Sequence, residues 1–156
     1  MSMEQQAADL REEGDALNEM LLTLALEDWT RATPFKDWTV NAVMQHLHQG
    51  DWMKVLTMKD SDAYLAAAAS RRAARERNDG SSGLEDHGFQ ASEGPALREQ
   101  WYAYFQEMCD LMAASDPVSV LNNPVVDFQW FKSNISRASG MARPCAYTHL
   151  DDADEG

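Results

Sequence analysis

The sequence has little cysteine, few positive charges and no long apolar run. Its two cysteines, Cys109 and Cys145, do not by themselves define a disulfide, and in a reducing compartment they are better read as free thiols or metal ligands. Lysine and arginine number 13 against 26 for aspartate and glutamate, which gives a net charge of −13. A surface this acidic repels nucleic-acid phosphates and anionic lipid heads. We therefore expect no nucleic acid and no membrane among its partners.

The apolar runs are all shorter than the about 18 residues that a membrane-spanning helix needs. The N-terminal residues include Glu4, Asp9 and Glu12, where a secretory signal would be basic and then apolar. These features predict a cytoplasmic protein. A chain of 156 residues is typical of one domain, which we expect over residues 1–150, followed by a frayed acidic tail at 151–156.

Apolar residues recur at helical spacing along most of the chain, which predicts an all-α fold. The expected helices cover residues 4–28, 40–58, 63–77, 95–114 and 136–150. Thr33-Pro34 interrupts the chain after the first helix, and Thr39 offers a cap for the second. Residues 78–96 are rich in glycine and serine and predict a long, mobile crossover connection. Together these elements describe a four-helix bundle, in which 63–77 is a helix or an extension of one.

The aromatic residues of segment 95–114 predict a core stripe rather than a cofactor pocket. That stripe consists of Trp101, Tyr104, Phe105 and Met108. Cys109 on the same helix is expected to be a small buried side chain. His87 lies in the glycine- and serine-rich connection, where a solvated histidine is the simplest expectation.

Residues 46–51 hold the densest cluster of ligand-type side chains. Successive helical residues point about 100° apart, so His46 and His48 diverge and do not share one ion easily. His46 falls on the same face as Leu47 and Gly50, and we expect it, rather than His48, to point into the bundle. Taken alone, this segment favours a core histidine with a satisfied hydrogen bond over a metal ligand.

Cys145 and His149 lie four residues apart, which places a thiol and an imidazole on one helix face. With His46 from the second helix they would supply three protein ligands and leave a fourth position open, as in catalytic zinc sites. The alternative is that Cys145 is a small buried hydrophobe and His149 a cation at a helix C-terminus.

Several motifs of this chain together resemble a known family. They are Leu10-Arg11-Glu12-Glu13-Gly14-Asp15-Ala16-Leu17, Asp28-Trp29, Thr33-Pro34, Trp38-Thr39-Val40 and His46-Leu47 followed by Asp51. In these motifs the sequence is similar to the N-terminal half of the DinB-like, mycothiol-dependent maleylpyruvate isomerase superfamily. The resemblance implies a four-helix bundle that holds a divalent metal, zinc or nickel, through a histidine of the second helix and two ligands of the last helix.

By this resemblance His46 matches the ligand of the second helix, and His149 can match the histidine of the last one. Cys145 stands where the nearest relatives have glutamate, and the match needs a one-residue gap beside Pro144. A cysteine thiolate also ligates zinc, so the site is either altered or lost. Glu13 matches a carboxylate of the family's first helix. Its side chain would either orient a metal ligand or be a solvated charge.

Two hypotheses for the function follow. In the first, the protein is a metal-dependent thiol transferase or isomerase, in which the ion activates mycothiol or another small thiol toward a small-molecule electrophile. In the second, the site has decayed and the bundle is a non-catalytic binding or dimerisation domain. A homodimer would then pair through exposed aromatic side chains near Trp52 or Trp130.

Overall fold

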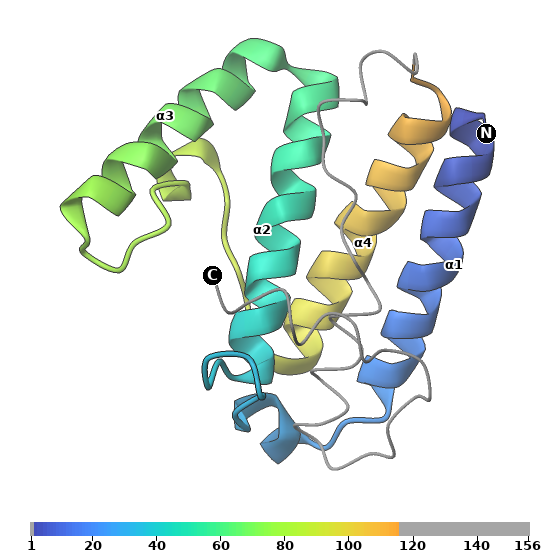
Figure 1. Ribbon diagram of the computed structural model, residues 1–156, viewed down its shortest axis with the longest axis vertical. Helices are drawn as coiled ribbons and strands as arrows, with labels where there is room; N and C mark the ends of the chain where they lie inside the picture. The colour runs from blue at the N-terminus through green and yellow to red at the C-terminus, as the bar shows by residue number, and fades with distance from the viewer. Residues whose placement is uncertain (1, 116–156) are drawn as a thin grey trace.

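The computed structural model describes residues 2–115, and their regular secondary structure is helical (Figure 1). In chain order the elements are α1 (Met3–Leu22), η1 (Leu26–Thr30), α2 (Val40–Lys59), α3 (Ser61–Arg77), η2 (Glu85–His87) and α4 (Gly94–Ala113). The all-α fold expected from the sequence is confirmed, and the helices predicted at 40–58 and 95–114 are present with nearly the same bounds. The helix predicted at 136–150 lies outside the described residues.

The first helix ends earlier than its apolar spacing predicts. Thr23 closes α1 by donating its hydroxyl hydrogen to the carbonyl of Met20. Asp28, the last residue of the predicted helix, accepts a hydrogen bond from the backbone N–H of Ala25 and so starts the 3₁₀ helix η1. This short helix turns Trp29 into the core, where it is 2% exposed. The prediction of a helix to residue 28 is therefore wrong, because local capping bonds divide the segment.

Side-chain caps set the starts of the next two helices. The Thr39 hydroxyl accepts from the backbone N–H of Ala42 at 3.1 Å, which confirms the expected cap of α2. The carboxylate of Asp60 accepts a hydrogen bond from the backbone N–H of Ala63 at 3.1 Å and caps α3. Because Asp60 also ends α2, the two helices are joined by a single residue and α3 folds back beside α2.

The main core lies where α4 packs against both α1 and α2 (Figure 1). Its buried members are Leu17, Leu21, Trp29, Val40, Val43, Met44, Leu47, Val55, Leu97, Trp101, Phe105, Met108 and Cys109. The predicted stripe of α4 is thus confirmed, with Tyr104 only partly buried at its edge. Gly14 lets α1 approach closely, because a Cβ at this position would overlap the ring of Phe105.

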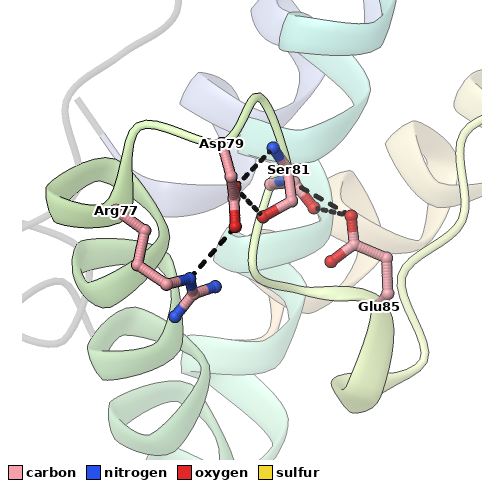
Figure 2. A network of polar contacts seen from close by, with 5 residues as sticks. Arg77, Asp79, Ser81 and Glu85 are labelled. Atoms are coloured by element: carbon pink, nitrogen blue, oxygen red, sulfur yellow. Dashed lines mark hydrogen bonds and ion pairs between the residues drawn. The ribbon is translucent and has the colours of Figure 1, made fainter.

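The connection between α3 and α4 is packed rather than loose. Leu84 and Phe89 are buried, and together with Ala67 of α3 they form a second cluster beside α2. Figure 2 shows how the turn after α3 is held: Asp79 accepts hydrogen bonds from Arg77 and Ser81. Apolar burial and carboxylate hydrogen bonds therefore hold the connection against α2 and α3, and its mobility stays a prediction.

No helix within residues 2–115 is long and apolar enough to cross a membrane.

Candidate functional site

His46 lies in the second turn of α2, and its side chain is exposed instead of pointing into the bundle. The imidazole meets the ring of Trp38 edge-on, with 5.5 Å between the ring centroids. Trp38 belongs to the loop before α2, whose ends are joined by an antiparallel bridge between Ala32 and Thr39. This loop therefore fixes the direction of the His46 ring.

The surroundings of His46 favour a neutral imidazole. Partial loss of water around the ring, and then the positive charge of Arg71 on α3, lower the pKa of His46 below its usual value of 6.5. The neutral form presents a free ring nitrogen, which is the form that ligates a metal ion. His46 is therefore an oriented imidazole on the outside of α2, available to a ligand or to another part of the chain.

His48 is the histidine that lies inside, so the sequence-based choice between the two was wrong. It is 1% exposed, and its ring contacts those of Phe89 and Tyr104, each with a centroid separation of 5.3 Å. Burial lowers the pKa of His48 to about 4, so the ring is neutral at pH 7. Its Nδ1 atom has no hydrogen-bond partner among residues 2–115.

The error over His46 and His48 has a geometric cause. The prediction took the face that holds Leu47 and Gly50 as the inner face of α2. In the structure α2 packs on α4 along one side and on α3 along another, so its buried arc is wide and is centred near Met44. A Cβ at Gly50 would meet open space, and His46, close to Gly50 on the helix, faces outward with it.

Asp51 is the most unusual polar residue of α2. Its side chain is fully buried, and one carboxylate oxygen accepts a 2.9 Å hydrogen bond from the indole N–H of Trp101 on α4. The Lys54 ammonium lies 3.9 Å from the other oxygen, which has no hydrogen-bond partner among residues 2–115. Burial raises the pKa of Asp51 to about 6, against the opposing effects of Lys54 and of Trp101. The carboxylate of Asp51 thus pairs with Trp101 and Lys54 inside the protein.

Two further groups could carry chemistry but are placed for structure. Cys109 is buried in the main core, and burial raises the pKa of its thiol to about 12, so it stays protonated. His87 was expected to be solvated, but its Nε2 atom lies 2.7 Å from the Ser70 hydroxyl of α3. This bond ties the connection to α3, so the expectation for His87 is wrong.

Of the three predicted metal ligands, His46 alone lies within the described residues 2–115. Within residues 2–115, no group of three or more His, Cys, Asp or Glu side chains could hold a metal ion. Cys145 and His149, the other two predicted ligands, lie outside the described residues. His46 is thus the one member of the set whose surroundings can be compared with the chemistry of a metal ligand, and its neutral, outward-facing ring fits that role.

One feature of the sequence could have predicted the hydrogen bond between Trp101 and Asp51. A tryptophan in a core stripe brings an indole N–H that needs an acceptor, and an acidic residue on the apolar face of another helix is a natural candidate. Trp101 and Asp51 are 50 positions apart, so only the pairing of α2 with α4 brings them together. No spacing rule within one helix identifies such a pair.

These features define the class of protein: an all-α, DinB-like helical bundle whose second helix presents a histidine after a Trp-Thr-Val loop. Residues 10–121 match the family model of the mycothiol maleylpyruvate isomerase N-terminal domain. The match spans more than half of the chain, and the protein therefore belongs to this family. Comparisons with curated proteins and with solved structures gave no match.

Proposed function

We propose that this protein binds a divalent metal ion and acts as a metal-dependent thiol transferase or isomerase. Membership of the mycothiol maleylpyruvate isomerase N-terminal family supports a link to mycothiol chemistry. The observation that carries the metal proposal is the state of His46, an exposed imidazole that Trp38 orients and that is kept neutral. A metal ligand needs these same properties.

His46, Cys145 and His149 are the proposed metal ligands. A histidine and thiolate set favours zinc, while nickel also accepts imidazole and thiolate. Such an ion, when bound, would lower the pKa of a small thiol such as mycothiol and so make a nucleophile at neutral pH. The proposed substrate is a small-molecule electrophile. The chain's own contribution through α2 is to hold one neutral ligand at a fixed angle.

The first test is the metal content of protein purified without chelator and then exposed to zinc or nickel, measured by mass spectrometry. We expect close to one ion per chain in the wild type. His46→Ala should lose most of it, because the imidazole is a ligand. His87→Ala is the matched control, since that histidine is engaged with Ser70 and should leave the metal content unchanged.

Cys145→Ala and His149→Ala extend the test to the other proposed ligands. Loss of metal in both, with the fold retained by circular dichroism, would support one site built from the three residues and would justify assays of thiol addition with mycothiol. A wild type that binds neither ion, or a His46→Ala variant with full metal content, would overturn the proposal. The first of these results would favour the alternative, a non-catalytic binding or dimerisation bundle.

A further inference from the structure

Arg71 of α3 is a partly buried cation in a chain that holds 26 acidic and 13 basic residues. The other partly buried arginines of the described chain, Arg11 and Arg98, are each paired with a carboxylate. No carboxylate within residues 2–115 pairs with Arg71, and burial, then the like charge of Arg75, lower its pKa. The guanidinium stays protonated even so. A charge that is partly removed from water without a partner favours an anion beside it.

The position of Arg71 follows from how α3 folds back on α2 (Figure 1). Asp60 joins the two helices, and Met53 and Ala67, each seven residues from it, belong to the second cluster. The same register sets Arg71 opposite the turn of α2 that follows His46, about 4.5 Å along the helix. The two helices diverge from their junction (Figure 1), so a long side chain of α3 is needed to reach α2 at this level.

The surface of α2 next to His46 has room for a ligand. Gly50 lies one turn beyond His46, and a Cβ placed there would meet no atom within 4 Å. Arg71 is near enough to this surface for its charge to lower the pKa of His46. A neutral imidazole, a glycine and an unpaired guanidinium therefore border one open region between α2 and α3.

We propose that Arg71 is the anion-binding residue of the site at His46, and that the electrophile carries a carboxylate. The substrate part of this inference rests on the proposed function. The guanidinium donates two parallel hydrogen bonds to a carboxylate, whose single charge matches its own. A phosphate group carries closer to two negative charges at pH 7, and the net charge of −13 repels it more strongly. Binding of the carboxylate at Arg71 would hold the rest of the molecule beside His46.

The dimer interface expected around Trp52 does not compete for this surface. Trp52 is 8% exposed and packs against Phe89, so its ring is not available to a partner. The expectation of an exposed aromatic surface at Trp52 is therefore wrong, and Trp130 lies outside the described residues. A homodimer stays a prediction.

An NMR titration of the full chain with propionate tests the anion site. We expect the backbone amide signal of Gly50 to shift saturably with propionate and to stay in place with propionamide, its uncharged analogue. Arg71→Gln should raise the dissociation constant for propionate by at least about tenfold, because charged hydrogen bonds are lost. Arg72→Gln is the matched control, since it removes the same charge from the exposed neighbouring residue and should leave the constant unchanged.

The titration is made without added metal, so its result does not depend on whether His46 ligates an ion. Arg71→Gln should also keep the metal content of the wild type, whereas His46→Ala should lose it under the proposed function. The absence of a saturable shift with propionate would overturn the anion site, as would equal weakening by Arg71→Gln and Arg72→Gln. Tighter binding of inorganic phosphate than of propionate would overturn the choice of a carboxylate.

A thiol-addition assay tests the substrate class separately. Arg71→Gln should raise KM at least about tenfold for 3-acetylacrylate, an enone that carries a carboxylate, and leave KM for the corresponding amide unchanged. An equal change in KM for the acid and the amide would overturn the assignment of Arg71 to the substrate carboxylate.

Discussion

The two apolar clusters on either side of α2 differ in how they are built. The main core takes large side chains such as Trp101 and Phe105 from helices that pack along their whole length. The second cluster takes Leu84 and Phe89 from the connection after α3, and α3 itself adds Ala67. Opposite Trp52 and Met53 of α2, the large buried side chains of this cluster therefore come from residues outside the helices.

The packing of α3 against α2 therefore depends on the connection that follows α3. Alanine side chains bury little area, so Ala67 and Ala74 provide only part of the packing that holds α3 against α2. Tyr64 and Ala68 of α3 add partly buried contacts, and the connection adds the buried side chains of Leu84 and Phe89 and the turn that Asp79 organises. We therefore expect α3 and residues 78–93 to open as a unit at a lower free energy than the main core.

The largest expected effect comes from removing one aromatic ring on each side of α2. Phe105→Ala should lower the free energy of unfolding of the whole domain by about 4 kcal/mol, because Phe105 is fully buried between α1 and α4. Phe89→Ala should leave the main core folded and increase amide exchange in α3 and residues 78–93. Urea denaturation measures the first effect, and hydrogen exchange followed by mass spectrometry locates the second.

The two clusters would not differ in stability if Phe89→Ala destabilised every helix equally. If Phe89→Ala increased amide exchange in α1 as much as in α3, the two clusters would form one cooperative unit. Fast amide exchange in α3 of the Phe105→Ala variant would not contradict a difference between the clusters, because global unfolding exposes every helix. The informative quantity is therefore exchange in α1 in the Phe89→Ala variant.

Asp51→Asn should give the next largest effect, a change in how the free energy of unfolding depends on pH. The folded-state pKa of Asp51 is raised from 3.8 to about 6 by burial, so the folded protein holds a proton that the unfolded chain releases between these values. Stability from this group is present below pH 4 and is lost as pH rises through 6. Over that range the free energy of unfolding of the wild type should fall by about 3 kcal/mol relative to that of Asp51→Asn. The amide oxygen of the variant can still accept a hydrogen bond from the indole N–H of Trp101.

The measurement is the difference in urea unfolding free energy between the two proteins at pH 4 and at pH 7. Taking the difference removes the contributions of other carboxylates, such as Asp79 and Glu85, whose lowered pKa values act in the opposite direction. A difference that stays constant with pH would show that Asp51 remains ionised and that Lys54 and Trp101 compensate for its burial.

Helix positions could be predicted from the sequence because their signals are local. Thr39 precedes an apolar run, and Pro95 stands at the first turn of α4, so each start is encoded within a few residues. Gly14 lies at helical spacing from Leu10 and Leu17, and it falls on the buried face of α1 because only one face of that helix is buried. The end of α1 was missed because Thr23 and Asp28 form capping bonds that apolar spacing does not record.

The site depended on contacts between elements, which spacing within a helix does not specify. Apolar periodicity gives one direction for α2, but the helix packs on two neighbours, and this makes His48 the buried histidine and leaves His46 outside. Leu84 and Phe89 belong to a segment without periodicity, so their burial was not foreseen. Residues 46–51 alone favoured a core histidine at position 46, and it was the pair Cys145 and His149, together with the family resemblance, that pointed to His46 as a metal ligand.

The smallest expected effect tests the bond between α3 and the connection. Ser70→Ala removes the 2.7 Å contact with His87, and a hydrogen bond of this kind contributes about 1 kcal/mol. Amide exchange in α3 and residues 78–93 should therefore accelerate about fivefold, while α1 and α4 remain unchanged. Ser61→Ala is the control, because Ser61 is exposed at the start of α3 and its side chain makes no hydrogen bond within residues 2–115. Unchanged exchange in Ser70→Ala would mean that the bond to His87 contributes little, and that packing of Leu84 and Phe89 alone holds the connection in place.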